Sequence, residues 1–392
     1  MKKLLMLIIS ISLVLTAASS VSAATSKFKD VKANHWASNA INEAAQKGFI
    51  KGYPDGTFKP SNNITRAEFA SLLAKISGLV GEPHQSKEVF SNVPSWAKEA
   101  VDNLVEAGYI DQNDYKKKPK ATEAISRYEM VKWMVTGLTI AEPTYKQALD
   151  ETKGTLVPFT EYYKSGIPAD RIPYVAVARG TQLTVGLPDG SFGFDKPTTR
   201  AEVAVILKRY LGLLGNKADD FKELSELREV GRTGTNIMTH GAKVGLSQND
   251  KPLFFEDIVG KEIKTKTGGT VTVHRYVVVD ASSKEIVGVY ANMFVDNSIN
   301  RIPDSVLAFI EITYKPASEK MNELLFLSEV TSVTAQRLQN YNLIGKYGYR
   351  SYYFDFIKGK QERFWVVDLV ERNYRWIDIK AIDGSAASFK FE

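Results

Sequence analysis

The sequence contains no cysteine and only four histidines. Without cysteine the chain has no disulfide bond, no thiol nucleophile and no lipid-modified N-terminal cysteine, so packing alone must stabilise it. The histidines show no spacing typical of zinc ligands. They are His35, His84, His240 and His274. We therefore expect neither a metal site nor a cofactor.

Long apolar runs are also missing beyond the first residues. A membrane-spanning helix needs about 20 apolar residues, and no later run approaches that length. At the start, Lys2 and Lys3 precede an apolar stretch over 4–15, and small residues at 21–23 suit a cleavage site. We interpret 1–23 as a secretory signal peptide, because a retained anchor would need a longer apolar stretch. We expect an exported chain with no membrane span after cleavage.

The composition is that of a globular protein with more than one domain. The chain has 392 residues, of which 44% are hydrophobic and 24% charged, and this length exceeds that of one ordinary core. The formal net charge of +6 permits attraction to anionic polymers. The basic cluster at 116–120 is interpreted as a solvated loop, since nucleic-acid binding is not expected of an exported protein.

A short motif occurs three times, at 65–68, 126–129 and 199–202, and each copy precedes an apolar helical pattern. It consists of a hydroxyl residue, Arg, any residue and Glu, which together can form a helix-capping box. The predicted caps are Thr65, Ser126 and Thr199, and their glutamate partners are Glu68, Glu129 and Glu202. The box does not explain the arginines, because the helix dipole disfavours a cation at a helix N-terminus. These arginines either brace neighbouring repeats or bind an anionic ligand through the guanidinium fork.

Each box belongs to a longer repeat, and the three repeats cover 27–80, 88–140 and 159–215. In the first and third repeats a Pro-Asp-Gly turn precedes the box: Pro54 lies 11 residues before Thr65, and Pro188 lies 11 before Thr199. The second repeat has lost this turn. Three copies of one unit predict a compact array in which neighbours complete each other's cores.

The motifs at 28–31, 35–37, 52–58 and 64–68 together resemble the S-layer homology domain, and the resemblance extends over 28–210. It implies a pseudo-threefold α-helical module. It further implies binding of secondary cell-wall polysaccharide, an anionic polymer often carrying pyruvylated sugar, in grooves between repeats. The arginine of each box would meet the acidic group, while loop and aromatic residues shape the groove. The candidate polysaccharide-binding residues are Arg66, Arg127, Arg200, Trp36, Trp96, Gly52, Asp55, Gly56, Gly186, Asp189 and Gly190.

The arginines are not equal candidates. Arg66 and Arg200 belong to repeats that keep the Pro-Asp-Gly turn, so we favour them as ligand contacts over Arg127. Trp36 and Trp96 either stack on a sugar or anchor the first helix of their repeats.

The remaining chain changes its periodicity. We interpret 216–235 as a linker, within which 221–230 has the helical propensity to dock beside the module. From 236 to 392 the pattern favours strands, and an antiparallel β-sandwich or barrel-like domain is the natural packing. The whole chain is thus expected to be an α + β multidomain protein. The predicted strands are 271–279, 284–295, 306–314, 352–357, 364–370 and 376–382, with hairpins at 280–283 and 358–360.

These observations favour a non-catalytic protein of the cell wall or S-layer surface. It would be anchored non-covalently to wall polysaccharide and display its β domain for interaction with other surface proteins or S-layer-associated assembly. An alternative is a tethered wall or polysaccharide hydrolase, since a glycosidase needs two facing carboxylates. Another is that degraded repeats leave only a scaffold. The acidic residues available in the β domain are Asp355, Asp368, Glu371 and Asp378.

Overall fold

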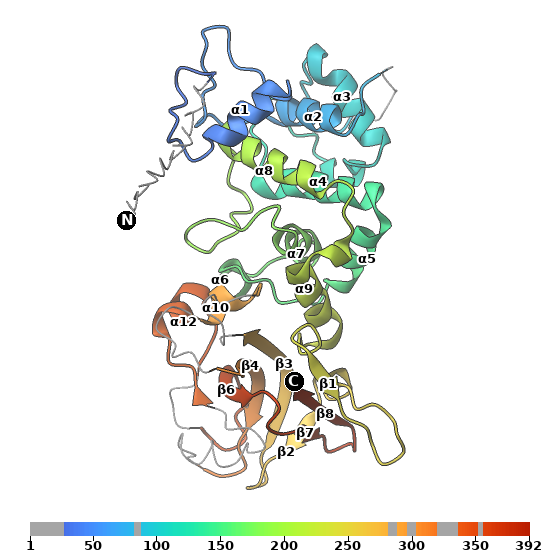
Figure 1. Ribbon diagram of the computed structural model, residues 1–392, viewed down its shortest axis with the longest axis vertical. Coiled ribbons are helices and arrows are strands. Elements are labelled where there is room, and N and C mark those ends of the chain that lie inside the picture. Colours follow the sequence, from blue (N-terminus) through green and yellow to red (C-terminus); the bar gives the residue numbers. More distant parts are fainter. Residues whose placement is uncertain (1–26, 82–87, 281–287, 296–302, 320–335, 352–355) are drawn as a thin grey trace, which may run out of the picture.

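The computed structural model describes residues 27–81, 88–280, 288–295, 303–319, 336–351 and 356–392, so the predicted signal peptide lies outside the described part. The chain is of mixed α and β structure, with most helices in the upper part of Figure 1 and the antiparallel strands in the lower part. Within the described residues, no helix is both long and apolar enough to cross a membrane.

The helices follow the three predicted repeats. The first repeat contains α1 (Ser38–Gln46) and α2 (Arg66–Ile76). The second contains α3 (Ser95–Glu106), the 3-10 helix η1 (Gln112–Tyr115) and α4 (Arg127–Ala141). Helix α5 (Pro143–Glu151) connects it to the third repeat, which contains α6 (Glu161–Lys164), α7 (Ile172–Gly180) and α8 (Arg200–Leu213).

The hydroxyl residues of all three boxes cap helices, as predicted. Thr199 Oγ1 accepts a hydrogen bond from the amide of Glu202 at 3.3 Å, and the Glu202 carboxylate accepts one from the Thr199 amide at 2.8 Å. Helix α2 begins with the same reciprocal box. In α4 the hydroxyl of Ser126 accepts from the amide of Glu129 at 3.2 Å, but the carboxylate of Glu129 accepts from Arg66. The second box is therefore used partly for contact with the first repeat.

The repeats contact one another in a closed cycle. Helix α1 packs on α8, α3 on α2 and α7 on α4, so each first helix packs on the second helix of another repeat. Backbone hydrogen bonds repeat the cycle: Ile64 N donates to Thr198 O at 2.9 Å, Thr198 N to Ile125 O at 3.2 Å, and Ile125 N to Ile64 O at 3.0 Å. Each repeat therefore satisfies backbone groups and buries apolar surface of its neighbours.

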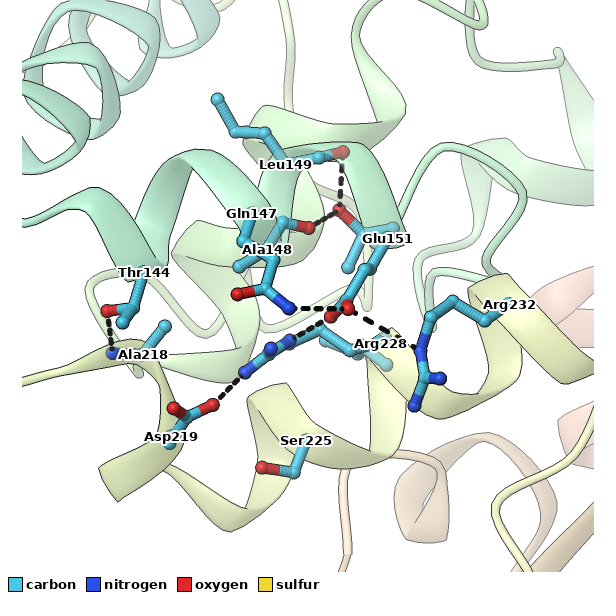
Figure 2. Close-up of polar contacts among 12 residues, drawn as sticks. Thr144, Gln147, Ala148, Leu149, Glu151, Ala218, Asp219, Ser225, Arg228 and Arg232 are labelled. Carbon is cyan, nitrogen blue, oxygen red and sulfur yellow. Dashed lines mark hydrogen bonds and ion pairs between the residues drawn. The ribbon is translucent and has the colours of Figure 1, made fainter.

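The region predicted as a linker is packed on the helices. After η2 (Ala218–Asp220), helix α9 (Lys222–Thr233) packs on α5 and α7, which confirms the helical prediction for 221–230. Figure 2 shows Arg228 of α9 between Glu151 and Asp219, with Arg232 also 3.7 Å from the Glu151 carboxylate. These ion pairs hold α9 against α5 and η2.

The β half contains two antiparallel sheets, and neither closes on itself within the described residues. One has the order β1-β8-β7, from β1 (Ala242–Val244), β7 (Ile377–Lys380) and β8 (Ala386–Phe391). The other has the order β2-β3-β4-β6-β5, from β2 (Glu262–Lys264), β3 (Thr270–Asp280), β4 (Ser305–Lys315), β5 (Gln336–Arg337) and β6 (Glu362–Glu371). Short helices η3 (Phe255–Asp257), α10 (Ala291–Phe294) and α12 (Tyr341–Tyr347) lie between strands.

The five-stranded sheet has two buried faces. Val277 and Phe309 join a core that is continuous with the helical repeats. Tyr276 and Ile310, their neighbours in sequence, belong to a separate core shared with Phe389 of the three-stranded sheet. This alternation is the period of two expected of a strand. One face of the sheet therefore lies against the helical half of the chain.

Several strand predictions are confirmed and others need correction. The predictions at 271–279, 306–314 and 364–370 correspond to β3, β4 and β6. The strand predicted over 284–295 is wrong at its end, because Ala291–Phe294 forms α10; a short apolar run does not distinguish strand from buried helix. The strand predicted over 376–382 corresponds to β7, but it is not the last strand, since β8 follows it.

The two predicted hairpins have a different outcome. The turn at 280–283 and the strand at 352–357 lie largely outside the described residues, and the partners of β6 are β4 and β5. The sequence patterns did not identify β1, β2, β5 and β8, of which all but β8 are two or three residues long.

Candidate functional site: a groove between the repeats

A groove of about 550 Å³ is formed by residues from all three repeats, and we call it the Arg127 groove. The first repeat contributes His35 and Trp36, and the second contributes Arg127. The third contributes the loop at 185–188 and one face of α8, including Arg209. The cyclic packing of the repeats thus brings together side chains that are far apart in the sequence.

Arg127 is the buried cation of this groove. One guanidinium nitrogen donates to Thr184 Oγ1 and another lies 3.5 Å from the Glu202 carboxylate, while Nε has no hydrogen-bond partner among the described residues. Burial lowers the pKa of Arg127; Glu202 opposes this change and Arg209 adds to it. A buried cation that pairs with one carboxylate, keeps one nitrogen without a partner and has a second cation nearby is a favourable partner for an anion.

Trp36 gives the groove an exposed aromatic surface. Its side chain is 65% exposed, and its ring is stacked on His35 with centroids 5.6 Å apart. An exposed ring of this kind can pack against the apolar face of a sugar. The prediction that Trp36 only anchors its helix does not explain this exposure.

Arg209 was not among the residues predicted from the sequence. It is exposed on α8 and follows Glu202 by seven residues, which is close to two helical turns. Residues two turns apart lie on one face of a helix, so the helical period could have placed Arg209 beside Glu202. The sequence alone gave no reason to look for a partner of Glu202, because it did not show that Glu202 faces a groove.

Arg66 has a different environment from Arg127. Its Nε donates to Glu129 Oε1 at 2.8 Å, and its Nη1 lies 3.5 Å from Glu123 and donates to the Lys120 carbonyl at 3.3 Å. Two carboxylates therefore neutralise this cation. These contacts are those expected of a brace between the first and second repeats.

Arg200 contacts the loop of the first repeat. It is buried, its Nε donates to the Phe58 carbonyl at 2.8 Å, and its Nη2 donates to the Lys51 carbonyl at 3.0 Å. The guanidinium carbon also lies 5.0 Å from the centroid of the Tyr53 ring. Carbonyl and aromatic partners leave the positive charge without a neutralising carboxylate in these contacts.

The contacts correct the way in which the sequence paired arginines with turns. The sequence pattern associates each arginine with the Pro-Asp-Gly turn of its own repeat, but each arginine contacts another repeat. Arg66 contacts the second repeat, Arg127 the third and Arg200 the first. The arginines next to repeats that retain the turn are therefore Arg127 and Arg200.

The acidic residues of the two turns serve the turns themselves. Asp55 Oδ1 accepts from the amide of Thr57 at 2.9 Å, and Asp189 Oδ1 accepts from the amide of Ser191 at 2.9 Å. Hydrogen bonds from the Thr57 and Ser191 side chains lower the pKa of both carboxyl groups. The left-handed positions of the turns, at φ of +77° and +83°, are Gly56 and Gly190.

The remaining glycines of the predicted site allow close packing. A Cβ atom at Gly52 would lie 2.2 Å from the Phe28 ring, and one at Gly186 would lie 2.7 Å from the Phe159 ring. Gly186 also lines the Arg127 groove. Trp96 is not in this groove; it lies on α3 and is 60% exposed.

The acidic residues considered for catalysis do not share one described site. Asp368 is buried on β6, Glu371 is exposed at the end of the same strand, and Asp378 on β7 accepts from Ser388 at 2.6 Å. Asp355 lies outside the described residues. In the described part of the chain, no group of three or more His, Asp or Glu residues could hold a metal ion.

Comparison with known proteins identifies an S-layer homology domain at residues 27–70. The chain is 40% identical over 87 residues to a cellulosome-anchoring protein of Acetivibrio thermocellus, covering 21% of this chain and 20% of that protein. It is 35% identical over 92 residues to an S-layer protein of Bacillus licheniformis, covering 24% and 10%. It is 28% identical over 193 residues to an amylopullulanase of Thermoanaerobacterium thermosulfurigenes, covering 48% and 10%. The chain thus spans a fifth or less of the length of these relatives.

Proposed function

We propose that this chain is an exported surface protein that its N-terminal repeats attach, without a covalent bond, to secondary cell-wall polysaccharide. The S-layer homology match at 27–70 supports attachment to the cell wall, because domains of this family bind wall polysaccharide. The similarity to anchoring and S-layer proteins supports a location at the cell surface. The closed cycle of backbone bonds supports a pseudo-threefold module of three such repeats. Two sheets that share one core support a sandwich-like C-terminal domain.

The single observation that carries the binding proposal is the Arg127 groove. A buried arginine that pairs with one carboxylate, Glu202, and has no partner for its Nε among the described residues lies in one groove with an exposed tryptophan ring and a second arginine. An acidic sugar has a charged group for Arg127 and Arg209, and an apolar ring face for Trp36. A pyruvylated sugar is the ligand that we propose for this groove.

We also propose a new order among the arginines, with Arg127 and Arg200 as ligand contacts and Arg66 as a brace. The cycle of contacts relates the environment of Arg127 to that of Arg200. By the same relation we infer that Trp96, exposed on α3, corresponds to Trp36 of the Arg127 groove. Arg66 is neutralised by Glu123 and Glu129, so it has less to gain from an anion.

The proposed role is anchoring without catalysis, in which the β half is displayed for interaction or S-layer-associated assembly. A tethered hydrolase is the competing proposal, because one relative is an amylopullulanase. That match covers 48% of this chain and 10% of the relative, so it gives the hydrolase no particular support. Zymography of the purified chain on wall polysaccharide separates the two, since a clearing zone would contradict a non-catalytic role.

The binding proposal is tested with purified walls that keep or lack their secondary polymer. We expect retention of the chain only where the polymer is present, and equal retention by both preparations would contradict the proposal. Arg127→Gln and Arg209→Gln should each weaken the affinity for the wall about tenfold, which is the effect of losing one charge-assisted contact. Arg209 is exposed, so its substitution is less able to disturb folding. Arg66→Gln is the matched control and should bind like the unaltered chain. Calorimetry with a pyruvylated disaccharide then tests the identity of the sugar.

A further inference from the structure

A second cavity, of about 600 Å³, lies between the third repeat and the five-stranded sheet, far in sequence from the boxes. We call it the Glu311 pocket. Helix α6 packs against α12, and Figure 1 shows these helices at the top of the β half. The main polar groups of the pocket are Tyr162, Tyr163, Arg275, Glu311, Arg350 and Arg363.

Strand register places the charged groups of the pocket on one face of the sheet. Glu311 of β4 is opposite Arg275 of β3 on one side and opposite Trp365 of β6 on the other. Arg363 precedes Trp365 by two residues and so projects from the same face. Arg275 forms an ion pair with the Glu311 carboxylate, and Arg363 Nε donates to Glu311 Oε1 at 3.0 Å.

The positive charges of the pocket exceed the negative ones. A single buried carboxylate, Glu311, serves two guanidinium groups, so this cluster has an excess of one positive charge. The third cation, Arg350, lies 3.6 Å from Glu362, which also pairs with Lys360 at 2.6 Å. Arg363 and Arg350 have side chains that are 51% and 74% exposed. Free guanidinium donors therefore face the solvent at the mouth of the pocket.

The inner wall supplies hydrogen-bond acceptors and apolar surface. Tyr162 accepts from Arg275 at 2.9 Å, and Tyr163 accepts from the Trp365 indole at 3.3 Å. The rings of these tyrosines and of Trp365 also line the pocket and contribute apolar surface. A ligand that fits must carry an anion for the arginines, hydroxyl donors for the tyrosine oxygens, and a ring-sized body.

We propose that the Glu311 pocket binds an acidic monosaccharide whose carboxylate or phosphate group contacts Arg363 and Arg350. The sugar hydroxyls donate to the oxygens of Tyr162 and Tyr163, while the buried Glu311 holds Arg275 and Arg363 in place. This site is separate from the Arg127 groove and does not depend on it. It gives the β half a binding function of its own.

Calorimetry on the purified exported chain tests the proposal with four probes: galacturonate, glucose 6-phosphate, glucose and inorganic phosphate. We expect at least one acidic sugar to bind, and the one that binds more tightly identifies a carboxylate or a phosphate as the preferred anion. Neutral glucose should not bind, and phosphate should bind more weakly than the sugar that is bound. No heat of binding for either acidic sugar, or equal affinity for the acidic and neutral sugars, would overturn the proposal. Equal affinity for phosphate and the acidic sugar would overturn the requirement for a ring.

Variants locate the binding. Arg350→Gln and Arg363→Gln should each weaken the affinity about tenfold, the loss expected for one charge-assisted contact. Arg350 is the safer variant, because it is exposed and contacts only Glu362 among the described ion pairs. Arg375→Gln, an exposed arginine outside the pocket, is the matched control and should bind normally. Unchanged affinity in both pocket variants would overturn the proposal. A loss of binding in Arg127→Gln would also overturn it, by placing the sugar in the other groove.

Discussion

Arg66 Nε donates to Glu129 Oε1 at 2.8 Å, so the arginine of the first box uses the carboxylate that would complete the second box. Glu202 of the third box does both, because it keeps its cap on Thr199 and lies 3.5 Å from Arg127. The same four-residue motif therefore serves folding within a repeat and contact between repeats. The glutamate of the second box serves mainly the contact between repeats, whereas the glutamate of the third box serves both roles.

The Arg66–Glu129 pair should contribute measurably to stability. Both side chains are largely buried, at 14% and 11% exposure. We expect the double-mutant cycle of Arg66→Ala and Glu129→Ala to give a coupling energy of about 0.5–3 kcal/mol in urea unfolding. The exposed Lys47–Glu43 pair is the control, and its coupling should be below about 0.5 kcal/mol. Equal coupling in the two pairs would show that Arg66 is not a brace.

Helix α9 should depend on the small size of Gly180. A Cβ atom at Gly180 of α7 would lie 2.5 Å from the Cα of Leu224, which is a backbone atom and cannot move aside alone. We expect Gly180→Ala to lower the free energy of unfolding by about 1–3 kcal/mol through overpacking. The control is Gly212→Ala in α8, where no atom lies within 4 Å of the new Cβ.

Urea unfolding of the two glycine variants gives opposite expectations. Gly212→Ala should leave the free energy of unfolding unchanged or raise it by up to about 1 kcal/mol, because alanine favours helix. If Gly180→Ala proved as stable as the unaltered chain, the close packing of α7 on α9 would be contradicted.

The stability of the β half should fall below neutral pH partly because of His274. Burial lowers the pKa of this imidazole, Arg363 and Arg275 lower it further, and Glu311 opposes them. The folded chain therefore favours neutral His274, and its contribution is complete above the unfolded pKa of about 6.5. As the pH falls below that value, the unfolded chain binds the proton more readily and stability is lost.

Urea unfolding at neutral and mildly acidic pH measures this effect. We expect His274→Gln to lose less stability than the unaltered chain between about pH 7.5 and about pH 5.5. Glutamine can keep a hydrogen bond to Thr313, whose hydroxyl lies 2.7 Å from His274 Nε2. Identical pH dependence in both proteins would contradict the assignment to His274.

Local sequence patterns predicted the helical half well. The hydroxyl residues of the boxes fixed the starts of α2, α4 and α8, because a cap and its helix lie within four residues of each other. Long alternating segments predicted β3, β4 and β6, because the alternation of a strand is also a local pattern. Strands as short as β1 and β5 carry too few residues for a period to be visible.

The sequence by itself determined the three capping motifs, the helix starts that follow them and the predicted division into repeats. Only the tertiary structure decided which arginine meets which loop, because every such contact crosses from one repeat to another. Arg127 lies beside Thr184, 57 residues away, and Arg200 beside Lys51, 149 residues away. Spacing along the chain reports local geometry, whereas the packing of whole helices sets the contacts between repeats. Arg127 was therefore the least favoured of the three arginines in the sequence, whereas its contacts across repeats lead us to propose it as a ligand contact.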